Sequence, residues 1–202
     1  MSTDIIIGAD GIPRCWWCGD DALYVDYHDR DWGRPLRNER ALFELLCLEG
    51  FQAGLSWITI LRKREAFREA FNGFEPEEVA RYTEGDVERL LANPGIVRHR
   101  GKISATVANA IALGAMREAG TSLRKIVWSH APAARRAPLR DRSKIPAETP
   151  ESAALARELR KWGMRYVGPT TVYAFMQSAG LVDDHLAGCH RAATGKKPSP
   201  KA

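Results

Sequence analysis

The sequence LRKWGMRYVGPTTVYAFMQSAG, residues 159–180, decides the fold of this chain. Two segments expected to be helical flank a short turn that bears Gly163 and Gly168. Glycines let a backbone approach a phosphate closely, and the first N–H groups of the second helix are free to bind an anion. The pattern is typical of a helix-hairpin-helix element that binds DNA. An ordinary pair of antiparallel helices is the alternative.

The segments around this element are also expected to be helical. Asn38 is a suitable N-cap for a helix over 38–51, and Ser56 for a helix over 56–72. Further helices are expected at 75–83, 84–92, 102–119, 121–130, 151–163 and 169–180. Because no segment alternates as a strand does, the predicted fold class is all-α, with many short helices around the helix-hairpin-helix element.

Length and composition set the expected domain organisation. The 202 residues, 45% of them hydrophobic, are enough for one domain with a real core. We expect a flexible leader at 1–13, a single domain at 14–190 and a disordered basic tail at 191–202. Residues 130–150, rich in proline, arginine and alanine, are expected to be an exposed connection. The formal charge of +5 favours a polyanionic partner.

The sequence also indicates the cellular compartment in which we expect the protein. We find no secretory signal and no apolar run of membrane-spanning length, so we expect a cytoplasmic protein with no membrane partner. Structural disulfides are rare in a reducing cytoplasm. Metal binding is therefore a better explanation than disulfide pairing for the four cysteines of the chain.

Cysteines and histidines near both ends of the domain form a candidate metal site. His185 and Cys189 are four residues apart, so one helical turn would direct both at one ion. Cys15 and His28 lie near the other end. Two thiolates and two imidazoles suit tetrahedral Zn²⁺, which would tie the two ends together. Scattered thiols and surface histidines are the alternative.

Other thiols and histidines leave the ligand set open. Cys18 and His190 are rival ligands, whereas Cys47 lies in an apolar helix and is expected to be a core residue. A catalytic zinc is disfavoured, because the PRCWWC stretch has no H-x-E partner and four protein ligands leave no position for water. We therefore expect a structural zinc.

A carboxylate stands on an apolar helical stripe. Leu42, Leu45, Leu46 and Glu49 follow i, i+3, i+4, i+7 spacing. A glutamate that reaches solvent, or that pairs with an arginine, is one interpretation. The other is a ligand-facing carboxylate in an aromatic pocket, which would suit a flat ring that is cationic or bears an amine. Four aromatic residues are candidates for the pocket walls: Trp17, Tyr24, Tyr27 and Trp57.

A basic turn, GIVRHRGK at 95–102, precedes the helix expected at 102–119. Arg98, Arg100 and Lys102 are candidates for contacts with DNA phosphates. A solvated, charged helix end is an equally good interpretation of the turn alone.

Five sequence blocks resemble those of the bacterial 3-methyladenine DNA glycosylase I family, the constitutive enzymes. The blocks occur in the family's order: YHDRDWG (27–33), LFELLCLEGFQAGLSWITIL (42–61), GIVRHRGKI (95–103), YVGPTT (166–171) and FMQSAGLVDDH (175–185). The resemblance runs from about Arg14 to Cys189. It implies a helix-hairpin-helix glycosylase that flips 3-methyladenine out of alkylated double-stranded DNA, hydrolyses its N-glycosidic bond and leaves an abasic site without cleaving the strand.

The resemblance also implies roles for individual residues. Glu49 matches the carboxylate that recognises the base, and Leu55 matches a residue expected to wedge into the gap left by the extruded nucleotide. Pocket positions are matched by Tyr27 and Trp57, and further by Tyr24 and Trp17. The zinc ligands implied are Cys15, His28, His185 and Cys189.

Asp183 departs from the family pattern. The wider superfamily has a supporting aspartate in a V-D-x-H context, and LVDDH places Asp183 there, where this family commonly has asparagine. Asp183 is thus a candidate catalytic residue that stabilises the cationic sugar. The interpretation we favour is that it caps the segment beside His185.

Two other functions remain as alternatives. One is a non-catalytic, zinc-stabilised sensor of alkylated DNA, and the other is an enzyme that acts on a free purine. The basic turns argue against the free-purine enzyme, because such an enzyme has no need of phosphate contacts. By resemblance, the protein is expected to be a monomer.

Overall fold

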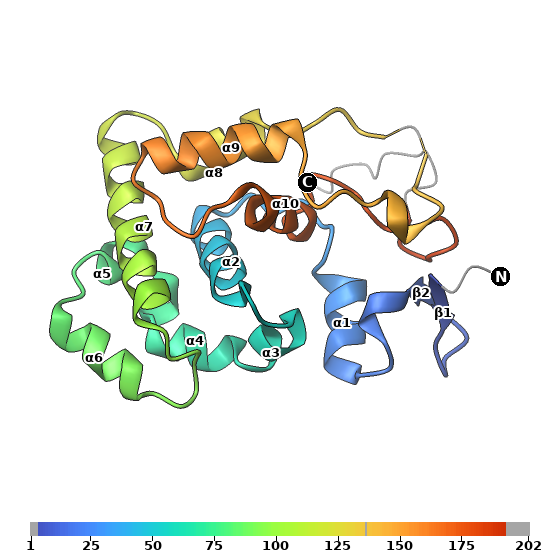
Figure 1. Cartoon of the computed structure of the whole chain (residues 1–202), viewed down its shortest axis with the longest axis horizontal. Helices are drawn as coiled ribbons and strands as arrows, with labels where there is room; N and C mark the ends of the chain where they lie inside the picture. The colour runs from blue at the N-terminus through green and yellow to red at the C-terminus, as the bar shows by residue number, and fades with distance from the viewer. Residues whose placement is uncertain (1–3, 136, 193–202) are drawn as a thin grey trace.

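The fold was analysed in a computed structural model that describes residues 4–135 and 137–192. Helices dominate this part of the chain, which confirms the predicted all-α class (Figure 1). The α-helices are α1 Ala22–Arg30, α2 Glu39–Gln52, α3 Trp57–Arg62, α4 Arg64–Ala70, α5 Pro76–Val79, α6 Glu84–Ala92, α7 Arg100–Glu118, α8 Leu123–Ser129, α9 Pro150–Lys161 and α10 Pro169–Ser178.

Helix α2 occupies the centre of the molecule (Figure 1). The Asn38 side chain caps it by accepting from the backbone N–H of Ala41 at 2.9 Å, as the sequence predicts. The helix packs against α7, α8 and α10, which explains why nearly every residue from Leu42 to Phe51 is buried. Glu49 is therefore carried into the interior by the most buried helix of the fold.

The predicted helix-hairpin-helix region folds as α9, a turn and α10, and the two helices pack against each other. Gly163 lies in the turn with a φ of 89°, a conformation that glycine adopts without steric cost. Met164 and Val167 anchor the turn because their side chains are buried. Tyr166, between these anchors, is exposed and has a φ of 56°.

The N-terminal segment differs from the flexible leader predicted for 1–13. From Asp4 onward it forms an antiparallel hairpin of β1 Ile5–Ile7 and β2 Pro13–Cys15. Asp4 is buried, and its carboxylate accepts from the backbone N–H of Arg142 at 3.1 Å. Two strands of three residues are too short to show alternation. Most of the predicted basic tail, 193–202, lies outside the described residues.

Two helical segments also differ from the prediction. Helix α1 was not expected, yet the Asp21 side chain caps it by accepting from Leu23 and Tyr24 N–H groups. The single helix predicted over 56–72 is divided at Lys63 into α3 and α4. At this division, the Lys63 ammonium donates to the carbonyl of Pro94 at 2.9 Å. Helix α1 matters most, because it carries Tyr24, Tyr27 and His28.

Candidate active site

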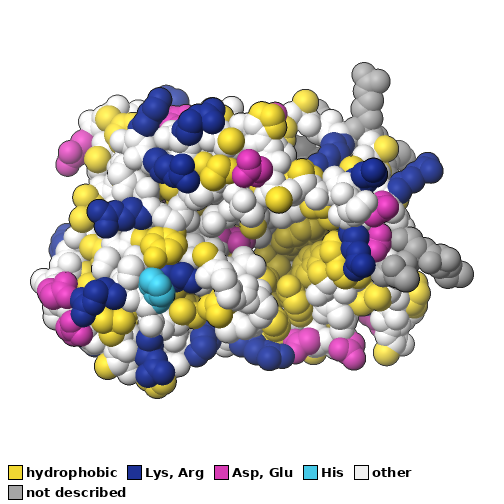
Figure 2. All heavy atoms as spheres, viewed as in Figure 1, with side chains coloured by type: hydrophobic (Ala, Val, Ile, Leu, Met, Phe, Trp, Pro, Cys, Tyr) yellow, Lys and Arg dark blue, Asp and Glu magenta, His cyan; other side chains and the backbone are white. Residues whose placement is uncertain are grey.

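A cavity of about 270 Å³ lies between α1, α2, α3 and α10. Figure 2 shows a hollow with a mainly hydrophobic wall in the region between α1, α2 and α10. The cavity is lined by Trp16, Trp17, Tyr24, Tyr27, Trp32, Glu49, Gln52, Trp57, Ile145, Ala174, Gln177 and Ser178. The fold thus brings together Glu49 and all four aromatic residues predicted for the pocket walls.

Aromatic rings form a continuous wall around the cavity. The ring centroids of Trp17 and Tyr24 are 5.1 Å apart, and those of Tyr27 and Trp57 are 5.5 Å apart. Trp32 also packs its ring edge-on against Trp17. The Trp57 indole N–H is buried and has no hydrogen-bond partner within the described residues. Such a wall offers flat apolar faces to a planar ligand, and one unused donor.

Glu49 is the acidic residue of the lining and is only 3% exposed. Tyr27 donates its hydroxyl to Ser178 Oγ at 3.2 Å, and Ser178 donates to Glu49 Oε1 at 2.8 Å. Burial raises the pKa of Glu49 to about 8, although the hydrogen bond from Ser178 lowers it in part. Without a ligand, burial therefore favours the protonated carboxyl group, and a cation placed beside it would favour the carboxylate.

Ser178 and Gln177 are pocket residues that the sequence analysis did not single out. Both lie in the FMQSAG block near the end of α10, and Ser178 is 129 residues from Glu49 in the chain. Their presence in a family-like block was the available signal. Their side chains lack a local pattern that would have placed them beside Glu49.

Leu55 is positioned at the rim. It lies in the turn between α2 and α3, where Gly54 has a φ of 82°, and its side chain is 42% exposed. It is not one of the cavity-lining residues. The leucine is thus presented to solvent two residues before Trp57, next to the cavity.

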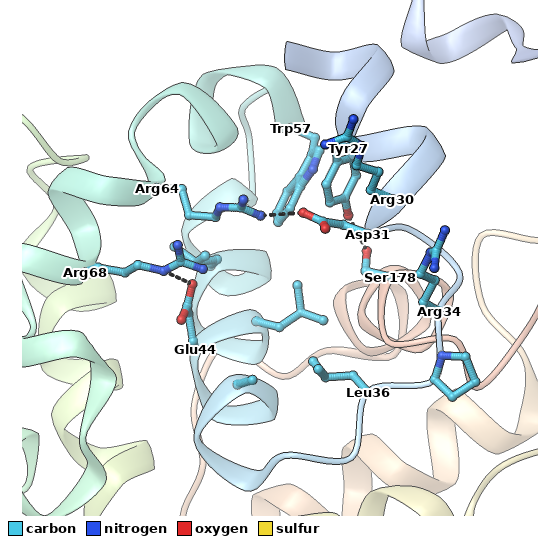
Figure 3. Close-up of a pocket in the computed structure, with 14 residues that line it drawn as sticks. Tyr27, Arg30, Asp31, Arg34, Leu36, Glu44, Trp57, Arg64, Arg68 and Ser178 are labelled. Atoms are coloured by element: carbon cyan, nitrogen blue, oxygen red, sulfur yellow. Dashed lines mark hydrogen bonds and ion pairs between the residues drawn. The ribbon is translucent and has the colours of Figure 1, made fainter. Parts of the chain in front are cut away.

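A second cavity, of about 320 Å³, shares Tyr27, Trp57 and Ser178 with the first (Figure 3). Two of its four lining arginines pair with acidic residues of the lining: Arg64 with Asp31 at 2.9 Å, and Arg68 with Glu44 at 2.8 Å. Both carboxylates that line it, Asp31 and Glu44, therefore have a cationic partner, whereas Glu49 has none among the described residues.

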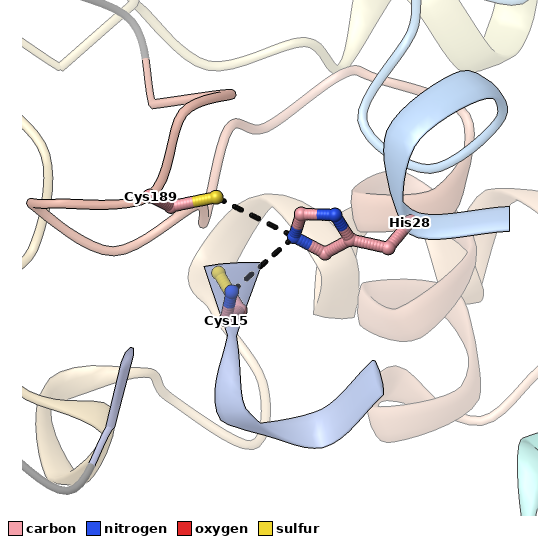
Figure 4. A group of neighbouring side chains, drawn as sticks. All are labelled: Cys15, His28 and Cys189. Carbon is pink, nitrogen blue, oxygen red and sulfur yellow. Dashed lines mark hydrogen bonds between the residues drawn. The ribbon is translucent and has the colours of Figure 1, made fainter. Parts of the chain in front are cut away.

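Three predicted metal ligands meet at the junction of β2, α1 and the C-terminal segment (Figure 4). Cys15, His28 and Cys189 are buried, and their ligand atoms lie within 4.8 Å of one another, so this group could hold a metal ion. The Cys189 Sγ is 3.4 Å from His28 Nε2. The other ring nitrogen of His28 contacts Asp29 Oδ1 at 2.7 Å, as carboxylates commonly do for metal-binding histidines.

The thiol pair is electrostatically unlike Glu49. A hydrogen bond from Cys15, together with the neighbouring His28, lowers the pKa of Cys189, while the same contact and burial raise the pKa of Cys15. Within the pair, Cys189 is therefore the thiol whose ionised form is favoured. Cys18 lies apart, with its thiol 3.2 Å from the carbonyl of Cys15.

His185, the fourth predicted ligand, lies next to this group but outside the 4.8 Å set. Its ring is 5.2 Å from that of His28, and its Nε2 is buried with no partner among the described residues. Asp183 Oδ1 contacts His185 Nδ1 at 2.8 Å. Asp183 is thus positioned beside His185 and is not one of the cavity-lining residues.

Comparisons with known proteins agree with this geometry. A family model described as methyladenine glycosylase matches residues 17–192. The chain belongs to the methyladenine glycosylase family. It is 48% identical over 179 residues to a DNA-3-methyladenine glycosylase of Haemophilus influenzae, covering 87% of this chain and 96% of that one. It is 49% identical over 181 residues to DNA-3-methyladenine glycosylase 1 of Escherichia coli, covering 88% and 96%.

Solved structures of 3-methyladenine DNA glycosylase I are similar throughout the fold. A crystal structure with 50% identity has a TM-score of 0.85 and is matched over 88% of this chain and 98% of its own. The Staphylococcus aureus enzyme, studied for its recognition of 3-methyladenine, has 41% identity and a TM-score of 0.80, with 84% and 91% covered.

The sequence leaves two interpretations of the basic turn, phosphate contacts and a solvated charged helix end, and Lys102 fits neither. Lys102 is 7% exposed and donates to main-chain carbonyls, so it is not available to phosphates. Arg100 pairs with Glu84 and Glu88, and Arg98 is exposed.

Within the described residues, no helix has both the length and the hydropathy needed to cross a bilayer.

Proposed function

We propose that Glu49 and the aromatic cavity receive 3-methyladenine flipped out of alkylated double-stranded DNA. Family membership makes the chain a DNA-3-methyladenine glycosylase, an N-glycosylase that removes 3-methyladenine from DNA. The observation that carries the assignment of the site is the buried Glu49 carboxyl group, held by Ser178 inside a wall of tryptophans and tyrosines.

Recognition follows from charge. A methyl group at N3 gives adenine in DNA a positive charge, whereas undamaged adenine has none. In the cavity this cation would stabilise the ionised form of Glu49, and the carboxylate would accept from the exocyclic amine. Stacking on Trp57 returns about 1–3 kcal/mol of the cost of extruding the nucleotide. An uncharged base leaves Glu49 protonated and gains none of the ion pairing.

Excision follows from leaving-group quality. The glycosidic bond breaks with its electrons moving to the cationic base, which leaves as a neutral molecule. Water then bonds to the anomeric carbon of the oxocarbenium-like sugar and loses a proton to solvent, leaving an abasic site. The described residues that line the cavity include no lysine, which supports hydrolysis without a Schiff base or strand cleavage.

Asp183 has a positioning role in this account. Its carboxylate contacts both the backbone N–H and the ring of His185, at 3.0 and 2.8 Å. This favours support of the metal-binding segment over stabilisation of the sugar.

The metal proposed at the Cys15–His28–Cys189 group is a structural Zn²⁺. Two thiols and an imidazole suit this ion, and the unpartnered Nε2 of His185 fits a fourth ligand. When bound, the ion would cross-link the N-terminal hairpin and α1 to the C-terminal segment. We further propose a cytoplasmic monomer, in which the four free cysteines suit a reducing compartment.

Base release from methylated duplex DNA tests the function. The freed bases are separated by chromatography after incubation with the protein. Release of 3-methyladenine, with 7-methylguanine largely retained and the strands intact, is expected. A folded, zinc-loaded protein that binds the DNA but releases no base would instead be the non-catalytic sensor.

A further inference from the structure

Lys102, near the start of α7, is a buried lysine that the reaction as described does not use. Its ammonium group donates to the carbonyl of Phe51 at 2.8 Å and to that of Ala53 at 2.6 Å. Both carbonyls belong to the end of α2, where main-chain oxygens have no partner within the helix and the helix dipole is negative. The lysine thus fastens the end of the helix that carries Glu49.

The turn that follows these carbonyls carries the proposed wedge. Ala53 is the C-cap of α2, Gly54 takes a positive φ and Leu55 is exposed. The Leu55 N–H donates to Gln52 O at 2.6 Å, so the position of the leucine depends on the direction in which α2 ends. Fixing the carbonyls on either side of Gln52 therefore fixes where Leu55 stands.

Helix α7, which carries Lys102, also contacts the turn of the helix-hairpin-helix element. Asn109 lies seven residues after Lys102, on the same face of α7. Its side-chain amide donates to Arg165 O at 3.2 Å and accepts from Arg165 N at 2.8 Å. Side chains on one face of α7 thus form hydrogen bonds with the main chain at the end of α2, before α3, and with the main chain of the turn before α10.

Tyr166 shows how closely the turn between α9 and α10 packs against α2 and α7. A Cβ on Gly50 would lie 3.2 Å from the Tyr166 Cβ, and a Cβ on Gly101 would lie 2.9 Å from its hydroxyl. The tyrosine therefore fits against α2 and α7 where glycines leave room. The distance between the hairpin and the end of α2 is therefore set by packing as well as by the hydrogen bonds of Lys102 and Asn109.

We propose that Lys102 is a positioning residue that sets the Leu55 wedge relative to the helix-hairpin-helix turn, so that phosphate binding and nucleotide extrusion occur in register. The proposal rests on the proposed function. Lys102 acts through the carbonyls of Phe51 and Ala53 and does not itself line the cavity, so the proposal predicts a larger effect on extrusion than on binding of the free base.

The test compares Lys102→Met with Lys102→Arg, which keeps a cationic donor, and with Lys125→Met, which removes an exposed lysine on α8. Single-turnover release of 3-methyladenine from duplex DNA is expected to fall by about 10- to 100-fold in Lys102→Met, the size expected of a small misplacement of reacting groups. Lys102→Arg is expected to recover part of the loss, and Lys125→Met to match the wild type.

Two further measurements separate positioning from a general loss of structure. Free 3-methyladenine, followed by tryptophan fluorescence, should bind Lys102→Met and the wild type within about twofold, because it needs only the pocket. In a double-mutant cycle, Lys102→Met should cost little in a Leu55→Ala background, because both changes remove the same step.

Three outcomes overturn the proposal: Lys102→Met as active as the wild type, losses that multiply with Leu55→Ala, or an equal loss of free-base binding. If Lys102→Met does not fold, the cycle is made with Lys102→Arg, and fully multiplicative losses again overturn it. Wild-type protein that releases no base contradicts the proposed function instead, so the two failures are distinguishable.

Discussion

Glu49 and the Cys15–His28–Cys189 group are both buried and ionisable, but their partners differ. Glu49 accepts a hydrogen bond from the Ser178 hydroxyl, and burial raises its pKa to about 8. The two thiols lie beside each other and beside His28, whose ring contacts Asp29, and the pKa of Cys189 is lowered while that of Cys15 is raised. In the first site burial favours the neutral acid. In the second, the contacts favour one thiolate, the form that binds a cation.

The two sites share α1, which places Tyr27 in the cavity and His28 in the metal group. A change that displaces α1 at one site would therefore also displace a residue of the other site. Variants of each site should show whether the two buried centres can be separated.

Removing a thiol from the metal group should have the largest effect. Cys15→Ala is expected to lose bound zinc and to lower Tm by about 10 °C or more, because metal binding contributes directly to folding. Metal analysis and calorimetry measure this. Cys18→Ala, a buried cysteine outside the group, is the matched control and should retain its zinc. A Cys15→Ala protein with unchanged Tm would contradict the metal site.

Neutralising the cavity carboxylate should come next. Glu49→Gln is expected to slow release of 3-methyladenine by about 100- to 1000-fold, the usual cost of removing one preorganised electrostatic group, with zinc content unchanged. Glu44→Gln is the matched control, because Glu44 is also buried on α2 but pairs with Arg68. Equal losses in the two variants would show that Glu49 has no particular part in catalysis.

The raised pKa of Glu49 should also be visible in stability. Between about pH 4.5 and 8 the folded protein retains a proton that the unfolded chain has lost. The free energy of unfolding should therefore fall as pH rises through this range, by up to about 1.4 kcal/mol per pH unit from this group. Denaturant titrations of the wild type and Glu49→Gln should give this difference. Parallel pH profiles would contradict the burial account.

Asp183→Asn should have the smallest effect on catalysis. Base release is expected to change by less than about threefold, because an asparagine oxygen can still accept from His185, while zinc affinity falls by up to about 10- to 100-fold. Competition with a chelator measures the affinity. Loss of base release at full zinc occupancy would place Asp183 in the reaction instead.

Local patterns predicted the parts of the fold that local interactions determine. Helix α2 and the position of Glu49 on its apolar stripe follow from periodicity, and the Asn38 cap follows from residue type. The burial of Glu49 was one of two interpretations that the sequence left open. The hairpin between α9 and α10 follows from glycine spacing. Helix α1 was missed, because its aromatic and charged residues serve two sites and leave no clear apolar stripe.

Contacts between distant segments could not be predicted from the sequence. The contact from Ser178 to Glu49 depends on how α10 packs on α2. Lys102 was a candidate for contacts with DNA phosphates, but the close packing of α7 on α2 directs its ammonium to main-chain carbonyls. In both cases the position of the side chain is set by helix packing, which spacing along the chain does not reveal.

The pH dependence of kcat/KM for 3-methyladenine release tests the central claim most directly, namely that Glu49 must ionise to receive a cationic base. With uncatalysed depurination subtracted, the wild-type value should rise about tenfold per pH unit up to a pKa near 8 and then level off. Glu49→Gln should be slow and lack this rise. A wild-type profile that is flat below pH 8, or a Glu49→Gln profile with the same rise, would contradict the claim.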